Sequence, residues 1–199
     1  MTQGMIKIGL TGSVGMGKTT TAKVFEKHGC DVWDADKTVH KLYSKGGKAV
    51  VKVAKLFPSS LEDGSISRSR LKALLKNEPE NLKELEEIVH PLILEDRKNF
   101  QKHTSFDVVV FDIPLLFETG ADKDMDKTVC VFTSTKNQME RLKNRNKEHD
   151  DYYKELMSKQ MPSRKKCDLA DYVIETTSHE AVEKRVVEIL DILRASPYA

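Results

Sequence analysis

Short apolar runs alternate with longer helix-like segments along most of the chain. The clearest runs are residues 5–10 (MIKIGL), 106–113 (FDVVVFDI), 128–132 (TVCVF) and 171–175 (DYVIE), with a further one at 30–36 (CDVWDAD). The continuously apolar run at 106–113 is typical of a strand buried on both faces of a parallel sheet. Helix candidates follow at 18–28 and from near Thr135 and Ser178. Strands that alternate with helices in this way predict an α/β doubly wound domain with a mostly parallel sheet.

The long stretch 37–103 breaks the alternation. It lacks strong strand signals and carries apolar residues at helical spacing, such as Leu71, Leu74 and Leu75. We interpret it as a helical insertion. Residues 144–168 are dense in charge around an amphipathic centre at Tyr152, which indicates either a solvated helix pair or a mobile cover.

The composition is that of an ordinary globular protein and does not identify a binding partner. The chain has 199 residues, is 39% hydrophobic and 32% charged, and carries a net charge of +2, which suits one compact domain with or without a smaller insertion. No apolar run approaches the roughly 20 residues that span a bilayer, and the small net charge gives no argument for nucleic acid. Residues 1–10 lack the marks of an export signal. Cys30, Cys130 and Cys167 have no metal-ligand spacing, so we expect reduced thiols in a cytoplasmic protein.

Residues 12–19, GSVGMGKT, match the pattern G-x-x-x-x-G-K-[ST] and lie between a predicted strand and a predicted helix. The glycines let the main chain curl so that successive N–H groups point at an anion, and the helix that follows adds its positive end. We expect Lys18 to reach the β and γ phosphates of ATP or GTP, and the Thr19 hydroxyl to ligate Mg²⁺. The predicted nucleotide-binding residues here are Gly12, Ser13, Val14, Gly15, Met16, Gly17, Lys18, Thr19 and Thr20.

Three kinds of nucleotide-binding protein can be compared on sequence alone. A GTPase needs N-K-x-D and D-x-x-G; residues 146–149 (NKEH) place His149 where an Asp must read guanine, and no D-x-x-G occurs. An ATPase motor could use Asp112, at the end of the apolar run, for Mg²⁺, but 199 residues leave little room for coupling elements. A small kinase fits the length better.

Candidate acceptor residues follow the second predicted strand. We expect the strand that ends at Asp34 and Asp36 to return beside the first strand and to end at the same sheet edge, where ligands of doubly wound sheets bind. One of these carboxylates can then orient an acceptor hydroxyl and take its proton. The alternative is that both acids only cap the strand end and the next helix.

Other candidates lie on later segments. Glu118 and the apolar residues 114–117 follow the buried strand and could face the acceptor or form a structural turn. His90 ends a predicted helix before Pro91. Arg141 and Arg145 lie four residues apart on one helical face and could stabilise transferred phosphate from a closing lid, although charge runs are more often solvated faces.

Taken in order, several segments resemble the dephospho-CoA kinase family. They are IGLTGSVGMGKTT (8–20), DVWDAD (31–36), DGSISRSRL (63–71), VHPLI (89–93), DIPLLFE (112–118) and LADYVIETT (169–177). The resemblance covers nearly the whole chain. It implies transfer of phosphate from ATP, with Mg²⁺, to the ribose 3′-hydroxyl of dephospho-CoA in the last step of coenzyme A synthesis.

The resemblance also implies an architecture, a three-layer P-loop kinase fold with a mostly parallel sheet. Its nucleotide-binding core would be residues 5–36, 104–140 and 169–199, its helical CoA-binding insertion 37–103 and its lid 141–168. Asp36 would be the base, while Asp34, Arg68, His90, Leu116 and Glu118 would lie on the CoA side. Lys18 and Arg141 would act on the transferred phosphate, and Arg145 would bind ATP. A monomer is a plausible state.

The chain departs from the family pattern at three places. Phe57-Pro58 replaces the F-G that the family often has, Arg145-Asn146 replaces R-D, and Thr176-Thr177 stands where the family has an Asn after the last strand. The last two departures concern how the lid is anchored and how the adenine edge is held. Two alternatives to a kinase that acts on a hydroxyl remain. One is a nucleoside monophosphate kinase, with Arg residues around a phosphate acceptor, and the other is an ATP-binding switch without acceptor chemistry.

Overall fold

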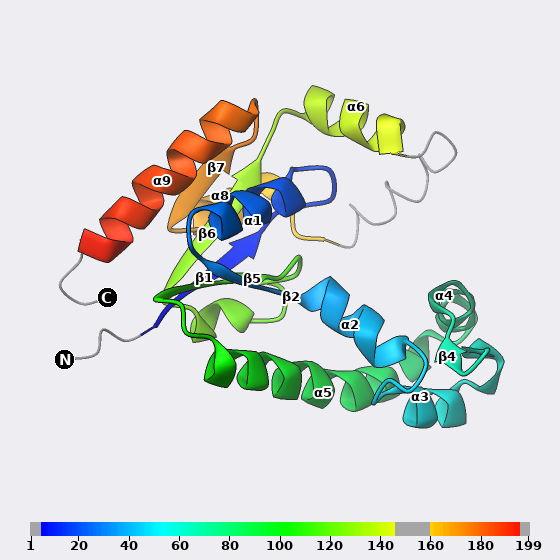
Figure 1. Cartoon of the computed structure of the whole chain (residues 1–199). Coiled ribbons are helices and arrows are strands. Elements are labelled where there is room, and N and C mark those ends of the chain that lie inside the picture. Colours follow the sequence, from blue (N-terminus) through cyan, green and yellow to red (C-terminus); the bar gives the residue numbers. More distant parts are fainter. Residues whose placement is uncertain (1–4, 146–159, 196–199) are drawn as a thin grey trace. The chain divides into compact units, whose positions relative to one another are not determined.

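The computed structural model describes residues 5–145 and 160–195 (Figure 1). It divides the chain into two compact units, which we call the core unit (Met1–Trp33 and Ser105–Ala199) and the helical unit (Asp34–Thr104). Each unit has its own cluster of buried apolar side chains. Half of the predicted lid (141–168), the residues 146–159 with Asn146, lies outside the described residues.

A five-stranded sheet forms the centre of the core unit, in the order β2-β5-β1-β6-β7. Its strands are β1 (Ile6–Thr11), β2 (Asp31–Asp34), β5 (Val108–Asp112), β6 (Lys127–Phe132) and β7 (Tyr172–Glu175). β1 pairs in parallel with both β5 and β6, and β6 pairs in parallel with β7. The predicted α/β fold with a mostly parallel sheet is confirmed.

One expectation about the sheet is wrong, because β2 does not return beside β1. β5 lies between them, and β2 is an edge strand. Every residue of β5 is buried, whereas three of the four residues of β2 are only half-buried. A strand that is apolar on both faces buries most apolar surface in a central position. The more polar β2 therefore takes the edge. There Trp33 packs against Phe111, with ring centroids 6.0 Å apart.

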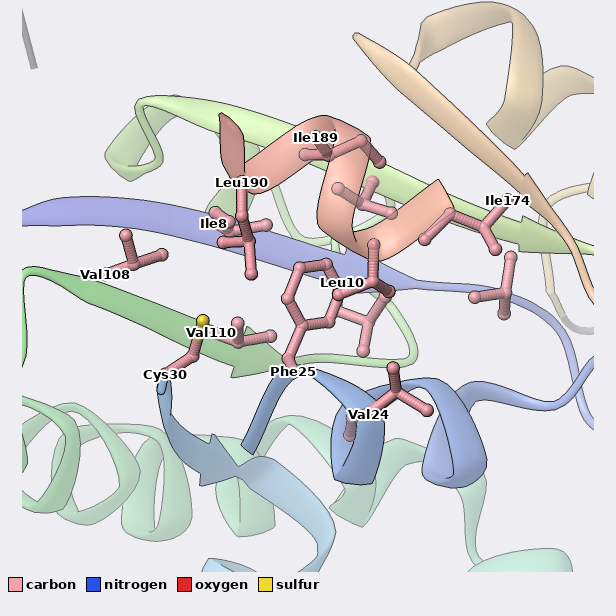
Figure 2. Packing of buried hydrophobic residues seen from close by; sticks show 14 of the residues in the cluster. Ile8, Leu10, Val24, Phe25, Cys30, Val108, Val110, Ile174, Ile189 and Leu190 are labelled. Atoms are coloured by element: carbon pink, nitrogen blue, oxygen red, sulfur yellow. The ribbon is translucent and has the colours of Figure 1, made fainter. Parts of the chain in front are cut away.

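Side chains along the strands alternate between two covered faces of the sheet. On one face, Ile8 and Leu10 of β1 pack with α1 (Lys18–Lys27) and α9 (His179–Ala195), as Figure 2 shows. Phe25 of α1 and Ile189 of α9 are fully buried there. On the other face, α8 (Ser163–Leu169) packs against β6. Helices on both faces explain why the central strands read as continuous apolar runs.

Further elements of the core unit are the short 3₁₀ helix η3 (Ala121–Asp124) and α6 (Thr135–Arg145). The three cysteines are free thiols. Burial raises the pKa of Cys30 to about 12, and burial also raises the pKa of Cys130, whose Sγ lies 3.4 Å from Sγ of Cys167. These thiols therefore behave as small apolar side chains at neutral pH.

The helical unit consists of α2 (Ala35–Tyr43), α3 (Val50–Leu56), η1 (Pro58–Ser60), α4 (Arg68–Asn77), η2 (Pro79–Asn81) and α5 (Leu82–His103). It also contains a small hairpin, β3 (Leu61–Glu62) with β4 (Ser65–Ile66), that the sequence analysis did not predict. The turn is Asp63-Gly64, with φ of 49° and 79°. An Asp-Gly pair accepts two positive φ values readily, so this dipeptide was the available signal for the hairpin.

His90 does not end a helix, as the following proline suggested, but lies inside α5. Pro91 removes one main-chain hydrogen bond, yet the helix runs on for another twelve residues, to His103. Leu85 and Val89 are buried in the apolar cluster of the helical unit. This packing holds the turns before the proline in place, and Pro91 itself is exposed. None of the described helices is long and apolar enough to cross a bilayer.

The core cluster gives a direct test of the packing. Replacing Phe25 by Ala removes a fully buried ring and should lower the free energy of unfolding by about 3–5 kcal/mol, through lost burial and the cavity left behind. Urea unfolding followed by far-UV circular dichroism measures this. Ile192→Ala, in a side chain of α9 that is 51% exposed, should change stability by less than about 0.5 kcal/mol. Equal losses in the two variants would contradict the assignment of the core.

Candidate active site

The predicted phosphate-binding loop connects β1 to α1, and two of its glycines lie where a side chain would clash or be strained. A Cβ on Gly12 would come within 2.3 Å of Cγ2 of Val131 in β6. Gly17, with φ of 95°, would place a Cβ 3.0 Å from Oγ1 of Thr176, just after β7. The loop therefore packs with its main chain directly on the ends of two strands. We call residues 12–17 the P-loop.

Side chains from distant segments fix the P-loop. Nε2 of Gln138, a buried residue of α6, donates to the carbonyl of Val14 over 2.7 Å. The Ser163 hydroxyl donates to that of Ser13 over 2.8 Å. These contacts use a loop carbonyl and a side chain, so they leave main-chain N–H donors to an anion. Gln138 and Ser163 were not predicted from sequence, because an uncharged side chain in a polar helix carries no local signal of such a contact.

Lys18, the first residue of α1, forms an ion pair with Asp112, the last residue of β5. The side chains are only 15% and 4% exposed, so this pair is largely removed from water. The sequence analysis considered Asp112 only for a motor and did not include it among the site residues. The structure brings it to the P-loop, because β5 pairs with β1 and the two strands end side by side. The available signal was an acid at the end of a buried strand.

The groups near Lys18 suit a magnesium ion carried by a nucleotide. Among residues 5–145 and 160–195, no three His, Cys, Asp or Glu side chains gather as ligands for a resident metal. Mg²⁺ in phosphoryl-transfer sites needs only one or two protein oxygens, since phosphates and water supply the rest. Thr19, which follows Lys18 in α1, and Asp112, which pairs with Lys18, are therefore the candidate oxygen ligands.

A pocket of about 440 Å³ lies beside the P-loop, within the size range of small-molecule sites. Its lining comes from the P-loop and α1, from α6, from the turn between β7 and α9, and from the start of α9: Gly15, Gly17, Thr20, Arg141, Asn144, Thr176, Thr177, Ser178, His179 and Val182. Of the predicted lid arginines, Arg141 is in this wall. Arg145 is the last described residue of α6, and its side chain lies outside the description.

Leu116, predicted to contact the substrate, is fully buried in the turn after β5. A Cβ on Gly9 of β1 would lie 2.8 Å from its Cδ2, so the side chain packs directly on the strand. Its neighbour Leu115 is 39% exposed. The Leu116 side chain thus packs the turn after β5 against β1. Any direct role toward a substrate stays a prediction.

Glu118 follows on the same turn and contacts a fully buried lysine that the sequence analysis missed. Nζ of Lys166, in α8, donates to the carbonyl of Pro114 over 2.7 Å and pairs with Oε1 of Glu118 at 2.8 Å. Oε1 also accepts from the N–H of Met161 over 2.9 Å. Burial raises the pKa of Glu118, but the hydrogen bonds from Lys166 and Met161 outweigh burial, so the pKa lies below its ordinary value of 4.5. Lys166 lies in a charged run that predicts only a solvated face.

The remaining predicted residues belong to the helical unit. Asp34 is the N-cap of α2, where its Oδ1 accepts from the N–H of Lys37 over 3.0 Å. Asp36 lies in the first turn of α2 with an exposed side chain. Arg68, at the start of α4, and His90, in α5, are also exposed. Substrate contacts of these four residues stay predictions.

Ligands of open parallel sheets bind outside the carboxyl ends of the strands. The P-loop, the ion pair of Lys18 and Asp112, and the pocket all lie at these ends of β1, β5, β6 and β7. A chain of 199 residues with this site, and without the base-reading motif of a GTPase, is of the small P-loop kinase class.

Comparison with known proteins narrows the class to a family. The family model described as dephospho-CoA kinase matches residues 6–181. The chain is 43% identical to the dephospho-CoA kinase of Ruegeria pomeroyi over 189 residues, covering 95% of this chain and 96% of the relative. It is also 43% identical to that of Jannaschia sp. over 187 residues, covering 94% and 96%. The chain belongs to the dephospho-CoA kinase family.

Solved structures agree with this assignment. TT1252 from Thermus thermophilus superposes with a TM-score of 0.88 at 26% identity, covering 97% of this chain and 99% of that one. Dephospho-CoA kinase from Campylobacter jejuni gives a TM-score of 0.67 at 25% identity, with 94% and 96% covered. Shikimate kinase from Acinetobacter baumannii, at 16% identity and a TM-score of 0.53, covers 99% and 97% and shares the fold alone.

Because the pKa of Glu118 is lowered, its contacts can be tested by measuring stability as a function of pH. A group whose pKa is lowered on folding stabilises the folded state above its unfolded pKa, and this stabilisation is lost as pH falls through the folded pKa. Wild type should therefore lose stability more steeply than Glu118→Gln as pH falls below 4.5. Urea unfolding at several pH values from about 6 to 3 measures the slopes.

Lys166→Met provides the matched background for this test, because it removes the ammonium that lowers the pKa of Glu118. In that background, Glu118→Gln should change the acid slope much less. An equal change in both backgrounds would mean that Lys166 does not stabilise the ionised form of Glu118.

Proposed function

We propose that this kinase transfers the γ-phosphoryl group of ATP to the ribose 3′-hydroxyl of dephospho-CoA, giving coenzyme A and ADP. The observation that carries the proposal is the family match over residues 6–181, which spans the P-loop, the helical unit and β7. A kinase of this kind performs the last step of coenzyme A biosynthesis. Positioning and charge stabilisation account for most catalysis of phosphoryl transfer, and the core unit supplies groups for both.

On the nucleotide side, we assign the P-loop N–H groups and the positive end of α1 to the phosphates of ATP. The Lys18 ammonium would neutralise charge that develops on the transferred group, since it already lies beside the P-loop. The Thr19 hydroxyl and Asp112 would hold Mg²⁺, which would neutralise charge that develops on the phosphates. Release of Asp112 from Lys18 would then free both groups for these partners.

Arg141 is proposed to contact ATP from the pocket wall. Its guanidinium donates to Thr176, after β7, and pairs with no carboxylate among residues 5–145 and 160–195. Its positive charge is therefore available to the nucleotide, whether to phosphates or to the face of the adenine ring. Arg145 remains a proposed ATP contact on the basis of its spacing from Arg141.

On the acceptor side, the two neighbouring acids of the sequence D-A-D have different local roles. The Asp34 carboxylate caps α2, which supports a positioning function for it. The Asp36 side chain is exposed in the first turn and takes no part in the cap. This difference supports Asp36 as the base that orients the 3′-hydroxyl and accepts its proton.

We propose that the insertion 37–103, with Arg68 and His90, binds the CoA part of the acceptor, and that residues 141–168 act as a lid. Both arginine and histidine are exposed and can meet phosphate or pyrophosphate groups. Glu118 and Leu116 would define the acceptor side of the core unit through the turn after β5. The three free cysteines, two of them buried, support a cytoplasmic location.

The acceptor can be identified from ADP release. Purified protein with Mg²⁺ and ATP should release ADP rapidly with dephospho-CoA, and the product should carry a 3′-phosphate. AMP, CMP and adenosine serve as competing acceptors. Turnover with AMP or CMP instead would make the protein a nucleoside monophosphate kinase, and acceptor-independent release would favour an ATP-binding protein without acceptor chemistry.

The role of Asp36 can be separated from ATP binding. Asp36→Asn keeps the size of the side chain but removes its basicity, so kcat should fall by about 10²- to 10⁴-fold. Affinity for ATP, measured by calorimetry, should change little. Asp63→Asn is the control, because asparagine also tolerates the positive φ of the hairpin turn. Unaltered turnover in Asp36→Asn would remove the proposed base.

A further inference from the structure

Thr176 occupies the turn between β7 and α9 and is only 4% exposed. Its N–H donates to the carbonyl of Phe132, at the end of β6, over 2.8 Å. The residue is therefore held in line with the sheet.

The Thr176 hydroxyl links the P-loop to Arg141. Oγ1 donates to the carbonyl of Met16 over 2.8 Å and accepts from Nη1 of Arg141 over 2.8 Å. A hydroxyl has one proton and two lone pairs, so it can serve a carbonyl and a guanidinium at once. One small side chain thus satisfies a P-loop acceptor and an arginine donor.

The main chain of Thr176 adds a second bond to the same arginine. Nη2 of Arg141 donates to the Thr176 carbonyl, while Nη1 donates to Oγ1. Two bonds from one guanidinium fix its plane as well as its position. A third, long contact of 3.5 Å runs from Nη1 to the carbonyl of Gly15. Arg141, Gly15 and Thr176 all line the pocket of about 440 Å³.

Steric fit makes the arrangement tight. Oγ1, Cβ and Cγ2 of Thr176 lie 3.0–3.1 Å from the position of a Cβ on Gly17. The threonine therefore fills the space that the glycine leaves open. A longer side chain here requires movement of the P-loop or of the β7–α9 turn.

We infer that Thr176 is a positioning residue for the nucleotide: its hydroxyl holds Arg141 in the pocket wall at a set distance from the P-loop. The inference rests on the proposed function only in taking ATP as the ligand of this pocket. Thr176 acts through Arg141 and the P-loop, so its effect should fall on ATP binding and should spare the acceptor.

Thr176→Val tests this, because it keeps the shape and removes the hydroxyl. Hydrogen bonds to charged groups predict a loss of about ten- to hundredfold in ATP affinity and a matching rise in KM for ATP. KM for dephospho-CoA should change less than about twofold. Thr176→Ser retains the hydroxyl and should restore most of the affinity. Calorimetry with ATP alone gives the affinity even if dephospho-CoA proves not to be the acceptor.

Two further variants decide whether the effect is specific. Thr128→Val removes another buried hydroxyl of the core unit, one bonded to Asp171 over 2.8 Å, and should lower the unfolding temperature without changing ATP affinity. Arg141→Gln should weaken ATP binding, and adding Thr176→Val to it should cost less than in wild type, because the two residues act together.

The inference is overturned if folded Thr176→Val binds ATP like wild type, or if Thr128→Val loses the same affinity. Full additivity of Thr176→Val and Arg141→Gln would also overturn it. Thr176→Ser decides the matter if the valine variant does not fold. Near-normal affinity in a folded serine variant supports the hydroxyl, and a large loss of affinity contradicts it.

Discussion

The close packing of the P-loop on the ends of β6 and β7 is the constraint on which the site depends. Gly12 leaves no room for a Cβ beside Val131, and a Cβ on Gly17 would crowd Thr176 at 3.0–3.1 Å. The main chain therefore lies where side chains would otherwise be, and close packing on the strand ends restricts the loop and its main-chain N–H groups. Such groups are oriented before a phosphate arrives, so binding costs little ordering of the protein. The pocket and Arg141 are in turn positioned relative to this loop.

Two lysines near the end of β5, Lys18 and Lys166, differ in burial and in the groups that they contact. Lys18 pairs with Asp112 next to the P-loop, where phosphates can compete for the ammonium. Lys166 is fully buried, and the Pro114 carbonyl and Glu118 satisfy its charge. A buried charge is tolerated only when its hydrogen bonds are made. Lys166 therefore joins α8 to the turn after β5, whereas Lys18 lies beside the P-loop, where a role toward phosphate is proposed for it.

In the helical unit, the start of α2 gives two neighbouring acids different environments. Asp34 and Asp36 are two residues apart, yet the geometry of a helix start separates them: the first is the N-cap of α2 and the second lies in its first turn. A capping carboxylate is held by main-chain N–H groups, whereas one in the first turn keeps its oxygens for other partners. The pair could not be assigned separate roles by spacing alone, since either acid could have been the cap.

The sequence by itself determined the α/β class, the parallel sheet and the P-loop between Ile6 and Lys27, because apolar runs, glycine spacing and helix signals are local. The resemblance also led to the correct family. Tertiary structure alone decided that β5 separates β2 from β1, that α5 continues through Pro91, and that Asp112, Gln138, Lys166 and Thr176 contact the site or its supports. Such facts depend on pairing and burial between residues up to 160 positions apart, and local patterns carry no record of which distant group a polar side chain will meet.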